Sequence, residues 1–164
     1  MIKVGVITAS DKGSQGERVD VSGQTIKEMV ERIEGTVTEY CILPDDRQVL
    51  AAKLREYADT SGVDLILTTG GTGFSVRDVT PEATLDVVER LAPGIAEVMR
   101  LESLKKTPKA MLSRAVAGIR GRTLIINLPG SPKAVRECLE AIFPALPHGI
   151  QILKGEAAEC ARQD

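Results

Sequence analysis

The stretch LILTTGGTG, residues Leu65–Gly73, is an apolar run that ends in a glycine-rich turn. Strands at the centre of a parallel sheet are apolar on both faces, so the pattern predicts a buried strand over Val63–Thr68. Glycines at 70, 71 and 73 allow positive φ and let backbone N–H groups approach a ligand without a Cβ in the way. The stretch therefore predicts a strand whose turn forms the floor of a site for an anionic ligand.

Further elements follow on both sides of this strand. Apolar runs predict strands over Lys3–Thr8 and Thr36–Leu43, and a hairpin of Arg114–Ile119 with Thr123–Asn127 around Arg120-Gly121-Arg122. Apolar residues at helical spacing predict a helix capped by Ser22 and a second helix that starts near Asp46. Thr80-Pro81 begins a further helix, and another follows the break at Pro93-Gly94. Ser131-Pro132 begins the next helix, and the last one carries Leu146, Ile150 and Leu153.

Strands that alternate with helices of this length predict the fold class. We expect a three-layer α/β/α sandwich with a mostly parallel sheet and one antiparallel hairpin strand. No repeat, linker or low-complexity segment divides the chain. The sequence therefore predicts one domain over residues 1–155 and a C-terminal tail over residues 156–164.

Composition excludes several classes of function. The 164 residues carry a formal net charge of −2 and 2% aromatic side chains without tryptophan, which argues against binding of nucleic acid. Cys41, Cys138 and Cys160 are scattered, and His148 is alone on the surface expected for the last helix, so no disulfide framework or zinc site is predicted. The sequence contains no apolar run long enough to span a membrane and no leading signal peptide, so we expect a cytoplasmic protein.

A second segment, LIINLPGSP, shares the plan of the first. In each segment an apolar strand leads into a glycine turn, and a helix that begins with Thr-Pro or Ser-Pro follows. Because ligands collect at the carboxyl ends of parallel strands, both turns should lie at one edge of the sheet. Turned amides near helix N-termini suit phosphate, although the P-loop and GxGxxG patterns are absent and one Gly-Gly turn alone is an ordinary loop device.

Carboxylates near the same edge suggest a divalent cation. Magnesium takes one or two protein carboxylates and completes its shell with substrate oxygens and water. Asp45, Asp46 and Asp78 are the candidates, with Asp45 preferred over Asp46, because one of these two neighbours is expected to be a helix cap. Asp78 has a competing structural interpretation as support for the helix N-terminus after it.

One lysine lies where the helix dipole opposes it. Lys133 falls in the first turn of the helix opened by Ser131-Pro132, where a cation is mildly unfavourable. The position indicates either an anionic partner or a solvated surface lysine.

Taken together, seven motifs identify a family resemblance that runs from residue 4 to about residue 155. They are TASDKGSQGE, DVSG, TTGGTG, RDVTPEAT, MLSRAVAG, NLPGSPKAV and LPHGIQILKG, in this order. In order and spacing they resemble the molybdopterin adenylyltransferase family of the Mog/MoaB type, which includes the gephyrin and plant Cnx G domains.

The resemblance implies an activity and an assembly. Members join AMP from ATP to the terminal phosphate of molybdopterin, with Mg²⁺, and release pyrophosphate; they are usually trimers, and a molybdenum insertase is the implied downstream partner. A phosphate nucleophile is already ionised, so the scarcity of histidine does not count against an enzyme. The alternative is a non-catalytic carrier or scaffold for molybdopterin, of the MoaB type. Paired aspartates favour catalysis, because a pure binder of an anion gains nothing from added negative charge without a metal.

The resemblance also implies roles for individual residues. Asp45 and Asp78 would be the catalytic, metal-binding pair. The nucleotide and its phosphates would contact Ser10, Asp11, Thr69, Gly70, Gly71, Thr72, Gly73, Pro129, Gly130, Ser131 and Lys133. Molybdopterin or its phosphate would contact Ser22, Gly23, Ser113 and Arg114.

Overall fold

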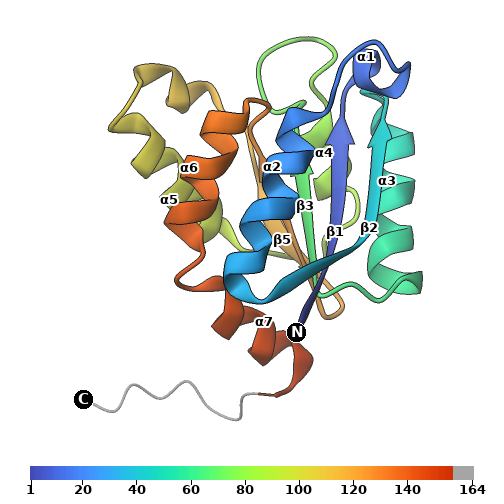
Figure 1. Cartoon of the computed structure of the whole chain (residues 1–164), viewed down its shortest axis with the longest axis vertical. Helices are drawn as coiled ribbons and strands as arrows, with labels where there is room; N and C mark the ends of the chain where they lie inside the picture. Colours follow the sequence, from blue (N-terminus) through green and yellow to red (C-terminus); the bar gives the residue numbers. More distant parts are fainter. Residues whose placement is uncertain (157–164) are drawn as a thin grey trace.

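Six strands form one sheet in the computed structural model, which describes residues 1–156 (Figure 1). The strands are β1 (Ile2–Ala9), β2 (Gly35–Leu43), β3 (Leu65–Thr69), β4 (Arg90–Leu91), β5 (Ala117–Arg120) and β6 (Thr123–Leu128), in the order β2-β1-β3-β6-β5-β4. Strands β2, β1, β3 and β6 are parallel neighbours, and β5 pairs antiparallel with both β6 and β4. The predicted fold class is confirmed.

Helices cover both faces of this sheet. They are α1 (Asp11–Ser14), α2 (Val21–Val30), α3 (Arg47–Arg55), α4 (Thr80–Leu85), α5 (Pro93–Leu104), α6 (Pro132–Ile142) and α7 (Leu146–Lys154), with short turns η1 (Glu31–Ile33), η2 (Glu56–Thr60) and η3 (Pro108–Leu112). Helices α2, α5, α6 and α7 pack in one apolar cluster with one face of the sheet, whereas α3, η2 and α4 pack on the other face.

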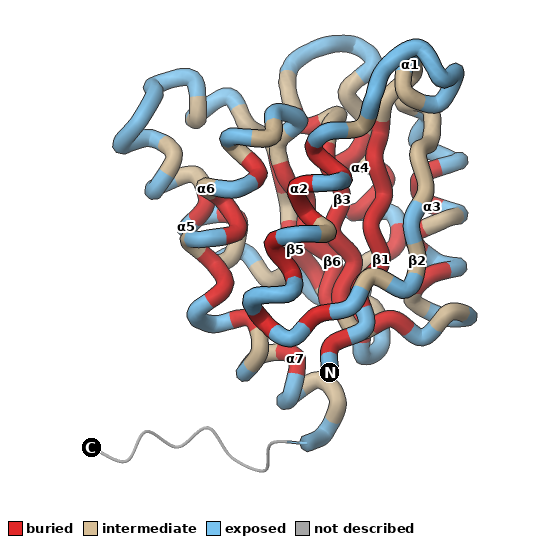
Figure 2. Tube along the Cα trace, in the orientation of Figure 1, coloured by how far each residue is buried: buried red, intermediate tan, exposed pale blue. Residues whose placement is uncertain are grey.

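The central strands are buried on both faces, as the apolar runs predict. Along β3, Leu65 and Leu67 join the cluster with α2 and α6, and Ile66 joins the cluster with α3. All five residues of β3 are buried (Figure 2). Because β1, β2 and β3 run parallel, their carboxyl ends lie at one edge of the sheet, beside α1 at the top of Figure 1.

A buried polar network sits behind this edge. The Asn127 side-chain amide donates to the Thr68 hydroxyl at 3.0 Å and the Thr84 hydroxyl at 2.8 Å, and its carbonyl accepts the Val116 amide at 3.2 Å. Asn127 is fully buried. Because a satisfied buried network fixes the groups that make it, β3, β6 and α4 are held in one arrangement below the two glycine turns.

Two predicted helix starts differ from the structure. Asp20, not Ser22, caps α2: its carboxylate accepts the Gly23 amide at 2.9 Å, and Ser22 is buried in the first turn. Thr80 is the first residue of α4 rather than its cap. Both side chains face neighbouring turns instead of the helix end, a tertiary role that local spacing does not reveal.

The segment after α4 also differs from the prediction. The helix opened by Thr80-Pro81 ends at Leu85 instead of Pro93, and Arg90–Leu91 forms the edge strand β4. Two exposed residues give no alternation pattern, so this strand is invisible in the sequence. The loop before α2 likewise contains the short helix α1, capped by Ser10.

The remaining expectations concern the ends and the surface. The predicted tail lies, from residue 157 onward, outside the described residues, as does Cys160. His148 is exposed on α7, as expected. Across residues 1–156, none of the helices combines the length and apolar character needed to cross a membrane.

Candidate active site

A pocket of about 770 Å³ opens at the carboxyl edge of the sheet. The loop after β1, the turns after β3 and β6, and the start of α2 form its walls. Of the residues expected at the site, those that line it are Ser10, Asp11, Ser22, Asp45, Thr69, Gly70, Gly71, Asp78, Gly130 and Ser131. The structure thus brings together residues from most of the length of the chain.

Hydrogen bonds join the two glycine turns to each other. The Thr69 hydroxyl donates to the Pro129 carbonyl at 2.7 Å, and the Ser22 hydroxyl donates to the Gly130 carbonyl at 2.6 Å. Since β3 and β6 are adjacent parallel strands, their turns lie side by side. The prediction that both turns share one edge of the sheet is confirmed.

Glycine is required at two positions of the first turn. Gly70 and Gly71 have φ of +90° and +69°, a region that other residues rarely adopt. A Cβ on Gly70 would lie 2.5 Å from the Ala9 carbonyl oxygen, and one on Gly71 would lie 2.4 Å from Thr80 Oγ1. Gly73 does not share the positive φ; it leaves space instead, because a Cβ there would lie 2.9 Å from Asp78 Oδ2.

The two aspartates after β2 have different roles. Asp46 caps α3 by accepting the Val49 amide at 2.9 Å, and Asp45 lines the pocket. Burial raises the pKa of the Asp45 carboxyl, and the negative charges of Asp11 and Asp78 raise it further. By contrast, the hydrogen-bonded Arg77 guanidinium lowers the pKa of Asp11. Asp11 thus has a cationic partner of its own, whereas Asp45 lines the pocket without a salt bridge among the described residues. A bound cation would favour the ionised form of Asp45.

Asp78 does not cap α4. Its Oδ2 accepts the Ser75 amide at 3.0 Å within the loop after Gly73, and no side-chain bond caps this helix. The half-buried carboxylate lines the same pocket as Asp45. Asp78 lies directly before Val79, the N-cap residue of α4, so support of the helix N-terminus by its charge is compatible with a role in the pocket.

The donor set fits a hard divalent cation that shares its ligands with a substrate. Four aspartates line the pocket, at positions 11, 20, 45 and 78. Asp11 is paired with Arg77, and Asp20 accepts hydrogen bonds from Thr8, Gly23 and Tyr40, which leaves Asp45 and Asp78 as the candidates for a metal. Within the described residues no group of three or more His, Cys, Asp or Glu could form a complete metal centre. The buried Thr80 hydroxyl beside Gly71 has no hydrogen-bond partner in the described part of the chain. Magnesium, which takes few protein ligands and several phosphate or water oxygens, suits such a site.

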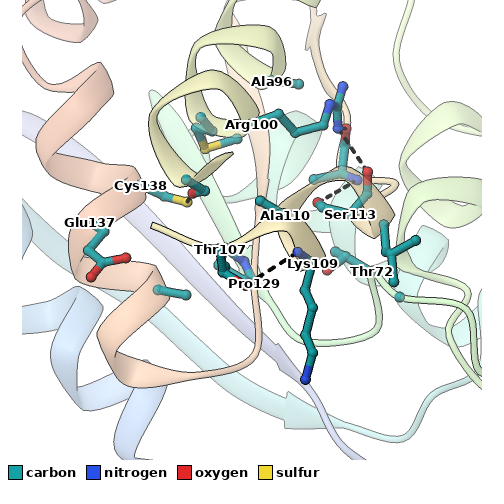
Figure 3. Close-up of a pocket in the computed structure, with 16 residues that line it drawn as sticks. Thr72, Ala96, Arg100, Thr107, Lys109, Ala110, Ser113, Pro129, Glu137 and Cys138 are labelled. Atoms are coloured by element: carbon teal, nitrogen blue, oxygen red, sulfur yellow. Dashed lines mark hydrogen bonds between the residues drawn. The ribbon is translucent and has the colours of Figure 1, made fainter. Parts of the chain in front are cut away.

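A second pocket, of about 300 Å³, adjoins the same two turns (Figure 3). Thr72 and Gly73 of the first turn, Pro129 of the second turn and Ser113 line it, against apolar side chains of α5, η3 and α6. Arg100 donates to the Ser113 carbonyl at 3.2 Å and holds that segment in place.

Arg114 contacts the protein rather than either pocket. Its guanidinium donates to the carbonyls of Gly73 and Asp78, both at 2.8 Å, and forms an ion pair with Glu82. It lines neither pocket. Arg114 thus holds the loop that carries Asp78, and its contact with phosphate or pterin stays a prediction.

Two other predicted residues lie outside both pockets. Gly23 is buried in the first turn of α2, where a Cβ would meet Asp20 Oδ2 at 2.1 Å, so it shapes the helix cap. Lys133 is exposed on α6. The cations that do line the main pocket are Lys12 and Arg18, which make no ion pair among the described residues. Lys12 lies in the four-residue helix α1 and Arg18 in the loop after it, and neither segment is long enough to show a periodic pattern in the sequence.

The fold and the pocket together define a three-layer α/β protein with two glycine turns and a group of aspartates at the carboxyl edge of its sheet. The sequence model of the MoCF_biosynth family, described as "Probable molybdopterin binding domain", matches residues 5–148. The chain therefore belongs to this family, and the resemblance seen in its motifs is confirmed.

Known relatives cover almost the whole chain. A molybdopterin adenylyltransferase of Helicobacter pylori is 47% identical over 156 residues, 94% of this chain and 89% of the relative. The cinnamon molybdenum cofactor synthesis protein of Drosophila melanogaster is 43% identical over 93% of this chain, which spans 26% of that longer protein. The crystal structure of MoaB from Thermus thermophilus superposes with a TM-score of 0.90 at 51% identity, covering 97% of this chain and all of that one.

Proposed function

We propose that this protein is a molybdopterin adenylyltransferase of molybdenum cofactor biosynthesis. It would transfer AMP from Mg-ATP to the terminal phosphate of molybdopterin and release pyrophosphate. The observation that carries the proposal is the placement of Asp45 and Asp78 in one pocket with both glycine turns. Relatives named for this activity, at up to 47% identity over nearly the full chain, support it.

The proposed chemistry depends on positioning and on charge. Backbone amides of Gly71, Gly130 and Ser131 would bind the ATP phosphates, and Asp45 and Asp78 would hold magnesium. Gly70 donates its own amide to the Leu128 carbonyl at 3.3 Å and would let the phosphates approach by its lack of a side chain. The bound ion would neutralise phosphate charge. A terminal phosphate oxygen of molybdopterin attacks the α-phosphorus of ATP; the new phosphoanhydride bond forms as the bond to the β-phosphate breaks, and pyrophosphate leaves. The nucleophile is already ionised, so no side-chain base is needed.

The second pocket supplies a place for the other substrate. We assign molybdopterin to this pocket, which Ser113 lines. Thr72 and Pro129 of the two turns also line it, so a ligand in this pocket would lie next to ATP phosphates bound at the same turns. Ser22 would contact phosphate at the junction of the two turns. Lys12 and Arg18 would bind phosphate as free cations on the pocket wall, and Lys133 stays a weaker candidate for the same task.

Assembly, partner and location complete the proposal. Val98, Leu101 and Leu104 of α5 and Met111 of η3 are exposed apolar side chains, which supports a homotrimer that covers them. A molybdenum insertase would take up the adenylylated product. We place the reaction in the cytoplasm, where its substrate ATP is made and used.

Transfer of label from ATP tests the proposal. With molybdopterin, Mg²⁺ and ATP labelled on its α-phosphate, the label should pass to the pterin while unlabelled pyrophosphate appears. Chelation of the metal should stop both events, because the two carboxylates alone would repel the triphosphate, and added Mg²⁺ should restore them.

Omission of molybdopterin is the control and should leave ATP intact. Binding of molybdopterin by the wild-type protein without any label transfer would contradict the proposal and favour the carrier or scaffold alternative.

A further inference from the structure

We propose that Arg77 is a positioning residue for the metal site: its bidentate ion pair with Asp11 fixes Asp78 relative to Asp45. The inference rests on the proposed function. It concerns a residue that lies outside the pocket lining and touches neither turn.

The first step is a reciprocal pair of bonds between the loops after β1 and β2. The Asp11 amide donates to Asp45 Oδ2 at 3.0 Å, and the Asp45 amide donates to Asp11 Oδ1 at 3.0 Å. Each aspartate therefore orients the other. The position and rotation of the Asp45 carboxylate depend directly on where Asp11 lies.

The second step links Asp11 to the loop after β3. Arg77 Nε donates to Asp11 Oδ2 at 2.9 Å, and Nη2 donates to Asp11 Oδ1 at 2.8 Å. Two parallel bonds between a planar guanidinium and a carboxylate fix direction as well as distance. Because Arg77 is the chain neighbour of Asp78, the pair ties the Asp78 backbone to Asp11 and, through it, to Asp45.

The pair also separates the role of Asp11 from those of Asp45 and Asp78, which line the same pocket. Both carboxylate oxygens of Asp11 accept hydrogen bonds, from Arg77 and from the Asp45 amide. Asp11 thereby has a cationic partner of its own. Asp45 and Asp78 are left as the carboxylates available to a divalent cation.

Because the Arg77–Asp11 pair is exposed, we expect it to position the two loops rather than to stabilise the fold. The side chains of Arg77 and Asp11 are 60% and 37% exposed, and ion pairs of this kind contribute little to folding. Arg47 and Asp86 provide a matched comparison. They form the same bidentate arrangement, at 2.7 and 2.8 Å, with side chains 54% and 34% exposed, and neither lines the pocket.

The test compares Arg77→Gln with Arg47→Gln. Binding of Mn²⁺, as a spectroscopic substitute for Mg²⁺, is measured by electron paramagnetic resonance in the presence of α,β-methylene-ATP. We expect Arg77→Gln to weaken Mn²⁺ binding by about 10- to 100-fold, as is typical when a residue that orients metal ligands is lost. Arg47→Gln should bind like the wild type, and both variants should melt at similar temperatures.

A third variant distinguishes geometry from charge. Arg77→Lys keeps the positive charge but cannot form two parallel bonds, so it should restore only part of the lost Mn²⁺ affinity. Wild-type affinity in Arg77→Gln, or equal losses in Arg77→Gln and Arg47→Gln, would overturn the positioning role. Failure of the wild-type protein itself to bind Mn²⁺ with the nucleotide would instead overturn the metal site of the proposed function.

Discussion

Asp78→Asn is expected to slow adenylyl transfer by about 100-fold or more, because loss of one preorganised charge at such a site has an effect of that order. Folding should be unaffected. The carboxylate is half-buried at the pocket, and the hydrogen bond that it accepts from the Ser75 amide remains possible for the asparagine carbonyl. Steady-state rates of pyrophosphate release and thermal melting curves of the same samples measure the two effects.

Asp46→Asn is the matched control for this variant. Asparagine caps helices as well as aspartate does, and Asp46 contacts the Val49 amide rather than the pocket. Its activity should stay near that of the wild type. If Asp78→Asn melts well below the wild type, the residue supports the fold, and its assignment to the metal is wrong.

Gly71→Ala is expected to destabilise the protein by about 3 kcal/mol and to abolish tight binding of ATP. The residue has φ of +69°, and the added Cβ would lie 2.4 Å from Thr80 Oγ1 and 3.2 Å from Asp45 Oδ1. Left-handed backbone costs an alanine about 1 kcal/mol or more, and the crowding adds about 1–3 kcal/mol. Urea denaturation measures the stability, and calorimetric titration with Mg-ATP measures the binding.

Gly130→Ala, in the second turn, is the control for this variant. It shows whether any alanine in these turns destabilises the protein, or only one that is crowded and left-handed. The nearest atom to a Cβ there is the Gly70 Cα at 3.6 Å, an ordinary contact, and φ is not positive. Its stability should stay within about 0.5 kcal/mol of the wild type. Equal stabilities of the two variants would show that the first turn does not require its left-handed glycine.

Most of the fold can be predicted from the sequence because its central strands carry a strong signal. LILTTGGTG and LIINLPGSP each begin with an apolar run, and both runs form strands buried between helices. The edge strand β4 is two exposed residues long and carries no such signal. Local spacing predicts Ser22 rather than Asp20 as the cap of α2, because the sequence does not reveal that the Ser22 hydroxyl bonds to Gly130, 108 residues away.

The site is predictable where residue type alone restricts the role. The motifs predict that the turn needs glycine at positions 70 and 71 and that Asp45 or Asp46 faces the site. The structure decides between the two aspartates, because Asp46 accepts the Val49 amide and caps α3. Long-range pairs are different. Arg77 lies inside RDVTPEAT, yet its partner Asp11 is 66 residues away, so nothing local assigns it a role.

The central claim is that the two glycine turns and the pair Asp45 and Asp78 form one Mg-ATP site. A crystal structure with Mg²⁺ and α,β-methylene-ATP tests it most directly. The account predicts the triphosphate against the amides of the turns after β3 and β6, with the metal between phosphate oxygens and the two carboxylates. A nucleotide bound elsewhere, or a metal that contacts neither Asp45 nor Asp78, would contradict it.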